Sequence, residues 1–395
     1  MIEQLYDEEA RRARHRLRVE EMRRNKEKQM MYRSYFKKYA PLAAGGVVIV
    51  LLILAGMKFF HKSSDEKMTE IDSSVTAETD ALPDRQAAGT LNYNEGIVKA
   101  MDIGSAMEQL KEDRRPKVYT ADSTADTVQL GSMLASGDEF YSDYAILIDM
   151  DNDSILAEKY ARTRINPASM TKILTVLVAA EHIEDLDDTF TMTLEITDYG
   201  YIHDCSSAGF EKGEEVSIKD LFYGTVLPSG ADAAVGLATY VAGSQEAFVE
   251  LMNEKLDELG LSQTTHFTNC VGVYDENHYC TVYDMAMIME AAMDNELCRE
   301  VMSAHTYTTS KTVQHPEGIS LSNLFLRRIE DRDCGGEVVC GKTGYVAQSG
   351  NCAASYAVDH NGKYYICVSA KANSPLRCIS DHAKLYKQFM EEAEL

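Results

Sequence analysis

A β-hairpin is predicted by two short runs, Tyr144-Ala-Ile-Leu-Ile-Asp149 and Ser154-Ile-Leu-Ala-Glu-Lys159, with the turn Asp151-Asn152-Asp153 between them. Apolar residues dominate both runs, and turn-forming Asp and Asn residues separate them. Strand-like runs return only near the end of the chain, at Glu337–Tyr345, Asn351–Val358 and Lys363–Ala370. Asn361-Gly362 is a tight-turn signal between the last two.

The middle of the chain, from about residue 167 to 300, shows apolar residues at helical spacing. The expected helices are Asp220–Leu227, Ala231–Val241, Gln245–Leu259 and Val282–Met293, and an amphipathic helix at Asp381–Glu392 closes the chain. Strands at both ends with helices between them predict an α+β domain over residues 129–395. Its antiparallel sheet is built from both ends of the domain, is flanked by helices and carries a helical insertion.

Charge divides the chain into a short basic head and a long acidic body. Residues 1–39 hold 12 Lys/Arg and 7 Asp/Glu, a net of +5, whereas the whole chain carries −24. The remaining residues therefore carry −29. An acidic body of this kind argues against nucleic acid as a partner, because phosphate binding needs a basic face.

The head ends at a candidate membrane span. The 19 residues from Tyr39 to Met57 carry no charge, and as a helix they would extend roughly 28 Å, close to the hydrocarbon thickness of a bilayer. We expect a cytoplasmic head at 1–38 and a transmembrane helix at 39–60, because arginines gather on the head side. A cleaved signal peptide and a buried core helix are weaker interpretations of the same run.

A polar segment over residues 61–128, poor in aromatic residues, is expected to form an extracytoplasmic stalk, with one short helix near Gly96–Lys111. All nine cysteines follow it, in a compartment that permits disulfides. The number is odd, no C-x-x-C occurs, and several cysteines sit in apolar runs, so pairing stays open between disulfides and buried thiols.

The stretch Asn166-Pro-Ala-Ser169-Met-Thr-Lys172 precedes the apolar run Ile173–Ala180. Asn at an N-cap and Pro at the first helical position predict a helix start, where free N–H groups favour a developing negative charge. Lys172 lies one turn beyond Ser169 on a helix expected to be buried. A buried amine tends to lose its proton, so Lys172 is a candidate base for Ser169. The spacing alone is weak, since an ordinary helix start with a solvent-reaching lysine has the same pattern.

Two further stretches offer polar side chains for the same site. Gly341-Lys342-Thr343-Gly344 lies on an expected strand, where glycine suggests the close approach of another backbone, here a peptide substrate. Lys342 would supply positive charge and Thr343 a hydroxyl for a terminal carboxylate. Ser229, in Pro228-Ser-Gly-Ala-Asp-Ala233, falls between two expected helices, and its plain interpretation is a turn or cap serine.

Taken together, Ser-x-x-Lys, Ser-Gly-x and Lys-Thr-Gly resemble the motifs of the penicillin-recognising serine D,D-peptidases, and best the D-alanyl-D-alanine carboxypeptidase family. Supporting stretches are His266-Phe-Thr-Asn269 and His278-Tyr279, and the resemblance covers residues 130–395.

The resemblance implies Ser169 as the acylated nucleophile, Lys172 as its proton acceptor and Ser229 as a proton carrier to the leaving amine. Lys342 and Thr343, on the strand Lys342-Thr343-Gly344-Tyr345, would bind the substrate carboxylate. The N–H groups of Ser169 and Tyr345 would form the oxyanion hole. Peptidoglycan stem peptides would be substrates and β-lactams inhibitors, with no cofactor and no metal.

One position departs from the family pattern, because Ala231 stands where the middle motif usually ends in Asn. An alanine offers no donor to the substrate carbonyl, so Asp232, Gln348 or a water would have to substitute. The sequence therefore also allows a catalytically weak module that binds wall peptides or penicillin without turnover. A β-lactamase or transpeptidase of the same fold is a further alternative.

Overall fold

The computed structural model describes residues 119–390. The predicted head, membrane span, short helix at Gly96–Lys111 and most of the stalk lie outside these residues and stay predictions. Among the helices that are described, none combines the length and the apolar character that a bilayer crossing requires.

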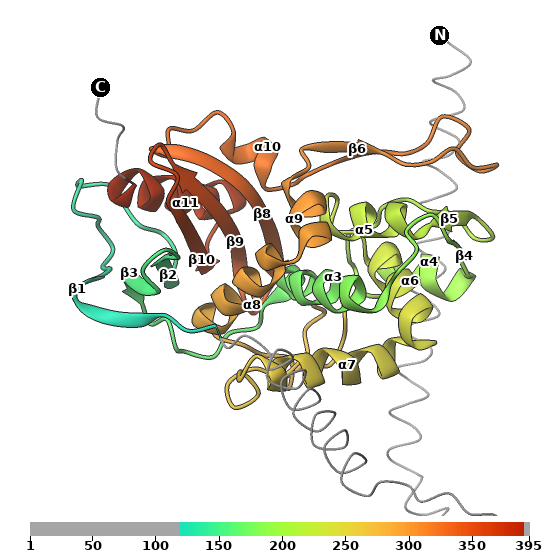
Figure 1. Ribbon diagram of the computed structural model, residues 1–395, viewed down its shortest axis with the longest axis horizontal. Helices are drawn as coiled ribbons and strands as arrows, with labels where there is room; N and C mark the ends of the chain where they lie inside the picture. The colour runs from blue at the N-terminus through green and yellow to red at the C-terminus, as the bar shows by residue number, and fades with distance from the viewer. Residues whose placement is uncertain (1–118, 391–395) are drawn as a thin grey trace, which may run out of the picture. The chain divides into compact units, whose positions relative to one another are not determined.

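The described domain is α+β and centres on a six-stranded sheet with the order β1-β3-β2-β10-β9-β8 (Figure 1). The hairpin β2 (Tyr144–Asp149) and β3 (Ser154–Lys159) comes from the start of the domain. The strands β8 (Gly336–Val346), β9 (Gly350–Asp359) and β10 (Tyr364–Ala372) come from its end. Because β10 pairs antiparallel with β2, both ends of the domain share one sheet, as the sequence predicted.

The sheet departs from the prediction at one edge, since β1 (Asp122–Gln129) pairs parallel with β3 and makes the sheet mixed. The sequence analysis had placed residues 122–128 in the stalk. The strand was hidden because it lies at an edge with its side chains almost all exposed, so its residues are polar and give no alternation signal.

Both faces of the sheet are covered, which explains the continuous apolar run in β2. Ile146 and Ile148 belong to the larger core, which also contains α8 (Val282–Asp294), whereas Ala145 and Leu147 belong to a smaller core with α11. Helix α11 (Pro375–Phe389) starts six residues before the predicted Asp381, because Ser374 accepts a hydrogen bond from the N–H of Arg377 and Pro375 opens the helix.

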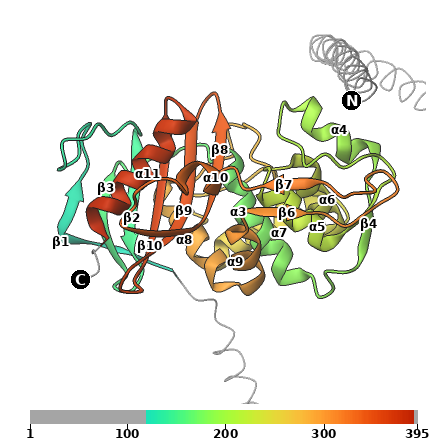
Figure 2. The same cartoon turned by 90° about the horizontal axis from the view of Figure 1, so that it is seen from above.

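The helical insertion packs around α3 (Thr171–His182), a helix whose side chains are buried on nearly every side. Its other members are α4 (Leu194–Ile202), α5 (Ile218–Val226), α6 (Ala231–Ala242), α7 (Gln245–Glu258) and α9 (Glu296–Ser303). Two small antiparallel pairs and one short helix complete the fold. The pairs are β4 (Thr189–Thr191) with β5 (Glu215–Ser217) and β6 (Thr306–Thr308) with β7 (Ser320–Ser322), and the helix is α10 (Leu326–Ile329). Figure 2 shows β8 at the border between the sheet and these helices, beside α3.

Candidate active site

Ser169 lies in a 3-10 turn, η1 (Ala168–Met170), directly before α3. The expected α-helical start at Pro167 is replaced by this tighter turn. The cap position is taken by Pro167, and Asn166 orders the chain just before it. The Oδ1 of Asn166 accepts a hydrogen bond from the N–H of Ala168 at 3.0 Å, and its Nδ2 donates to the carbonyl of His278 at 2.8 Å. The turn leaves Ser169 half-buried at the mouth of α3, above a helix that is buried behind it.

The Lys172 amine lies beneath Ser169. Its Nζ donates to Ser169 Oγ at 3.0 Å and to the carbonyl of Val271 at 2.8 Å. The side chain is 1% exposed, and burial lowers the pKa of Lys172 to about 8. A minor fraction of this amine, roughly a tenth at pH 7, is therefore neutral and able to accept a proton from the Ser169 hydroxyl, a fraction far larger than for an exposed lysine.

The carbonyl that holds Lys172 belongs to a loop shaped by Asn269. Its Oδ1 accepts hydrogen bonds from the N–H groups of Val271 (3.2 Å), Gly272 (2.7 Å) and Val273 (3.0 Å), and its Nδ2 donates to the carbonyl of Val273 at 3.0 Å. From the sequence, Asn269 belongs to a stretch that resembles the family, and no role for it could be predicted. The available signal was the Asn-x-x-Gly spacing, which is typical of side-chain-to-backbone turns.

The same loop packs closely against η1, the turn that carries Ser169. Gly272 has a φ of +90°, and a Cβ built on it would overlap the carbonyl oxygen of Ala168. Only glycine fits here, because both the backbone conformation and the space exclude a side chain.

We expect Gly272→Ala to lower the free energy of unfolding by about 2–4 kcal/mol, which corresponds to a fall in Tm of roughly 10 °C. Thermal unfolding followed by circular dichroism measures this change. Gly137→Ala is the matched control, since Gly137 also has a positive φ (87°) but no atom within 4 Å of its built Cβ. Equal losses in the two variants would contradict the close contact with Ala168.

A second serine–lysine pair faces the first from β8. Lys342 Nζ donates to Ser229 Oγ at 2.7 Å and to the carbonyl of Thr343 at 2.8 Å. Ser229 lies between α5 and α6 with a φ of +65°, a conformation that a non-glycine residue adopts at a cost. Strain of this kind is often found at functional sites.

Burial, and then the charge of Lys172, lower the pKa of Lys342 well below its usual value. Lys342 is 2% exposed, and the positive charge of the equally buried Lys172 disfavours the protonation of Lys342. Both effects act against the positive charge that the motif led us to expect on Lys342. A bound carboxylate would offset them, because it gives the ammonium form a counter-charge.

The glycines of β8 also allow close packing within the chain itself. A Cβ on Gly344 would lie 3.0 Å from the backbone nitrogen of Ser169 and 2.8 Å from Cys352 Sγ. A Cβ on Gly341 would overlap the ring of Phe325. The backbone that approaches β8 at Gly344 is therefore the chain's own serine turn, and this contact fixes Ser169 against the strand.

Asp232 cannot take over the role of the missing Asn. Its carboxylate accepts hydrogen bonds from Ser207 Oγ and from the N–H of Ala208, each at 2.7 Å, and from the N–H of Gly209 at 3.0 Å. Asp232 and Ala231 are both fully buried. The carboxylate thus holds the segment after α4 in place and does not reach a ligand, which rules out one of the three substitutes considered.

One cleft of about 940 Å³ brings the predicted residues together. It is lined by Ser169, Ser229, Thr343, Gly344, Tyr345 and Gln348, and Lys172 and Lys342 lie buried behind the two serines. Tyr345 is 65% exposed at its edge. The sequence analysis missed other lining residues, among them Asp204, Cys205 and Arg328, because they come from loops and a short helix with no periodic signal.

Every cysteine of the described residues is a free thiol, and all nine fall in this range. Eight are buried and Cys205 is half-buried. Burial raises the pKa of the buried Cys270 and Cys352 to about 12, so these thiols stay protonated. Of the two interpretations left open, the structure favours buried thiols.

An α+β domain with a serine at a helix mouth, a buried lysine one turn below it and a second serine–lysine pair on the facing strand defines the class of serine D,D-peptidase folds. The chain belongs to the D-alanyl-D-alanine carboxypeptidase family, whose model matches residues 132–373. The resemblance stated from the motifs is thereby confirmed at the level of the family.

Individual relatives agree with this assignment. The chain is 36% identical over 152 residues to the D-alanyl-D-alanine carboxypeptidase DacF of Bacillus subtilis, a match that spans 38% of this chain and 39% of the relative. It resembles the crystal structure of the Streptomyces K15 DD-transpeptidase with a TM-score of 0.57 and 27% identity over 64% of this chain and 98% of that one. Penicillin-binding protein 5 of Haemophilus influenzae matches with a TM-score of 0.57 and 26% identity over 64% of this chain and 71% of that one.

Proposed function

We propose that this protein is a serine-type D-Ala-D-Ala carboxypeptidase that removes the terminal D-alanine from peptidoglycan stem peptides. The observation that carries the proposal is the 3.0 Å hydrogen bond between the buried Lys172 amine and Ser169 Oγ, in the same cleft as the Lys342–Ser229 pair. The similarity to the Bacillus subtilis carboxypeptidase DacF supports it, and the match spans about two fifths of that relative.

In the first step, Ser169 Oγ attacks the carbonyl of the penultimate D-alanine while its proton passes to Lys172 Nζ. The oxyanion that forms lies at the mouth of α3, near the N–H groups of Ser169 and Tyr345, which stabilise it. The C–N bond then breaks as the leaving D-alanine amine receives, by way of Ser229, the proton that Lys172 took from Ser169. Water attacks the ester carbonyl and gives a proton to Lys172, and the ester C–O bond breaks as that proton returns to Ser169 Oγ, which restores the free serine and the neutral amine.

The terminal carboxylate of the substrate would lie at Thr343 and Lys342. A carboxylate placed here raises the pKa of Lys342 by giving its ammonium form a partner, so substrate binding and protonation of Lys342 are coupled. The D-Ala-D-Ala terminus would then provide both the reacting carbonyl and the negative charge that stabilises the protonated Lys342 of the Lys342–Ser229 pair.

The purified full-length chain in detergent, incubated with a fluorescent penicillin and with a pentapeptide ending in D-Ala-D-Ala, tests the proposal. D-alanine release together with labelling is the expected result. Labelling without release would favour the non-catalytic binding module that Ala231 suggests. Transfer of the acyl group to an added amine would favour a transpeptidase, which is the name given to the Streptomyces K15 relative. Rapid penicillin hydrolysis would instead favour a β-lactamase.

We expect the rate of acylation by penicillin to rise with pH. Only neutral Lys172 accepts the proton of Ser169, so the rate should increase by about tenfold per pH unit below 8 and level off above it. Stopped-flow or quenched labelling between pH 6 and 9 measures this profile. A rate independent of pH over that range would contradict a role for Lys172 as the base.

We expect Asn269→Ala to slow acylation by about 10–100-fold, because the loop that presents the Val271 carbonyl to Lys172 loses its shared acceptor. Asn269→Asp retains an oxygen for the three N–H groups and should restore most of the rate. The rates of penicillin labelling of the two variants, compared at equal folded fraction, test this expectation. Equal losses in both would show that the acceptor oxygen is not what matters.

The protein is further proposed to be a single-pass membrane protein, with residues 39–60 as its anchor, the basic head in the cytoplasm and the catalytic domain outside. The uncharged run and the positive charge before it support this orientation. Protease treatment of intact cells should remove the catalytic domain and spare a tag placed before residue 39. Protection of the catalytic domain would contradict the orientation.

A further inference from the structure

The segment that carries the reacting serine and lysine (165–172) and the loop that holds the lysine amine (266–273) are far apart in the sequence. A third segment, 278–280, lies between them and forms one antiparallel bridge with each. His278 in this middle segment is 1% exposed, and the steps of the proposed reaction give it no part. Its imidazole needs partners here, because burying a polar group without hydrogen bonds costs free energy.

Both ring nitrogens of His278 have a partner, one on each of the two flanking segments. Nδ1 lies 3.0 Å from the backbone nitrogen of Thr268 and 3.4 Å from Nδ2 of Asn269, and both of these groups are donors. Nδ1 is therefore the acceptor, and the ring proton lies on Nε2. Nε2 donates this proton to Thr171 Oγ1, at a distance of 2.8 Å.

The surroundings keep this imidazole neutral and hold its plane. Burial lowers the pKa of His278 to about 3, so the ring is uncharged at neutral pH. Protonation of Nδ1 would also place one N–H group against the N–H of Thr268. The ring stacks on Phe267 with the two ring centroids 4.7 Å apart. A neutral ring fixed in one tautomer can position its neighbours but does not carry protons between them.

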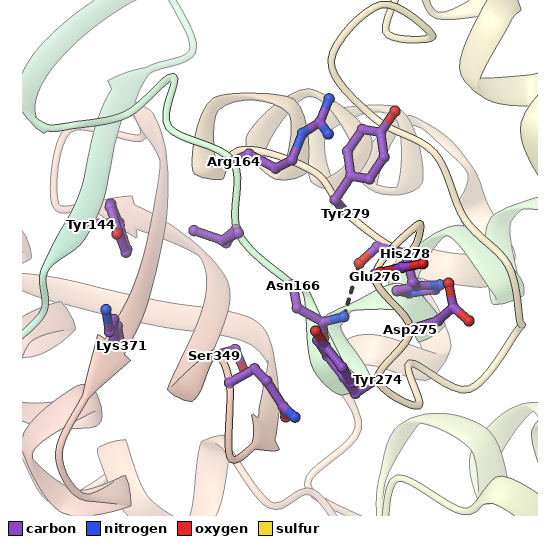
Figure 3. Close-up of a pocket in the computed structure, with 12 residues that line it drawn as sticks. Tyr144, Arg164, Asn166, Tyr274, Asp275, Glu276, His278, Tyr279, Ser349 and Lys371 are labelled. Atoms are coloured by element: carbon purple, nitrogen blue, oxygen red, sulfur yellow. Dashed lines mark hydrogen bonds between the residues drawn. The ribbon is translucent and has the colours of Figure 1, made fainter.

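The backbone of His278 contacts the serine turn as well. Its carbonyl accepts a hydrogen bond from Asn166 Nδ2 at 2.8 Å, which Figure 3 shows as the dashed line. Asn166 precedes Ser169 in the sequence, and Thr171, the partner of the ring, follows it. His278 therefore holds the chain on both sides of the nucleophile.

We propose that His278 is a positioning residue, which acts through Thr171 to hold Ser169 against the Lys172 amine. Thr171 begins α3 and directly precedes Lys172, so a shift of its hydroxyl moves the lysine stem. The amine is held from the other side by the carbonyl of Val271, and His278 sets the distance between the two segments by binding to both. The inference rests on the proposed function, of which it deepens the acylation step.

Replacing the imidazole tests the role on the full-length chain in detergent. His278→Phe removes both ring hydrogen bonds and keeps an aromatic ring beside Phe267. We expect the rate of penicillin labelling at saturating concentration to fall about 30-fold, while the concentration that gives half the maximal rate changes little. His278→Gln keeps a donor for Thr171 and should label within about threefold of the unmodified rate. Tm, measured alongside, corrects each rate for the folded fraction.

A double-mutant comparison tests the path through Thr171. Thr171→Val removes the acceptor oxygen and should slow labelling, whereas Thr171→Ser keeps it and should label at nearly the full rate. If His278 acts through Thr171, the double variant His278→Phe with Thr171→Val should also be about 30-fold slower, whereas independent losses would multiply. His266→Phe is the matched control, because His266 is exposed in the neighbouring segment, does not line the cleft and should leave the rate unchanged.

Three outcomes would overturn the positioning role while D-alanine release by the unmodified chain keeps the proposed function. These are a full labelling rate in His278→Phe, a His278→Gln variant as slow as His278→Phe, and losses that multiply in the double variant. Labelling of the unmodified chain without D-alanine release would overturn the proposed function alone, since labelling rates still report the position of Ser169. No labelling of the unmodified chain would overturn both.

Discussion

Replacing Ser169 by alanine will abolish both covalent labelling by a penicillin and the release of D-alanine. The hydroxyl is the one serine oxygen that is half-exposed in the cleft and hydrogen-bonded to a buried amine of lowered pKa, at 3.0 Å from Lys172 Nζ. Without it no acyl-enzyme forms, and a loss of at least about 10⁴-fold is expected, as for other nucleophile deletions. Gel fluorescence and D-alanine release measure the two losses.

Ser229→Ala provides the comparison for this variant. Ser229 also lines the cleft and bonds to a lysine, but it is only 4% exposed and its partner lies on β8. Its removal should slow labelling without preventing it, because the attacking oxygen remains. If labelling survived in Ser169→Ala and disappeared in Ser229→Ala, Ser229 and not Ser169 would be the nucleophile.

Lys172→Met is expected to lower the rate of acylation by about 10³-fold and to leave the protein folded. Methionine has nearly the length of the lysine stem and no amine, so it fills the buried site while removing the proton acceptor of Ser169. Removing an amine that burial disfavours in its charged form should keep Tm unchanged or raise it. Labelling rate and Tm, measured together, separate a lost base from a lost fold.

Lys212→Met, at an exposed position outside the cleft, serves as the control and should retain the full labelling rate. The residual activity of Lys172→Met should also lose the rise with pH below 8 that the unmodified protein shows. A variant that keeps this pH profile would show that another group acts as the base.

Much of the fold could be predicted because its elements carry local signals. The hairpin of β2 and β3 was predicted to the residue, and α6, α7 and α8 began at the predicted positions. Strand β1 was missed because an exposed edge strand has polar residues on both faces. The start of α11 was placed too late, because its first three residues are exposed and the start is defined by the cap Ser374 and by Pro375.

The candidate site was predictable where three short motifs each combined a reactive residue with a structural signal. The role of Asn269 was not, because its importance arises from three backbone groups that it joins and from the carbonyl it offers to Lys172. The hydrogen-bond partners of Asp232 could not be predicted from the sequence either. Next to the Ser229 motif it is a candidate ligand group, and only its four hydrogen-bond donors within the chain show that it is fully used.

By itself the sequence determined the order of strands and helices and the identity of the reacting groups, because periodicity, turn residues and side-chain chemistry act over short stretches of chain. Only the tertiary structure decided which groups meet. The contact of Gly344 with the Ser169 turn and the effect of the Lys172 charge on Lys342 join residues more than 100 positions apart. Distances of this kind are set by packing of the whole domain, and burial set by that packing shifts the pKa of each lysine.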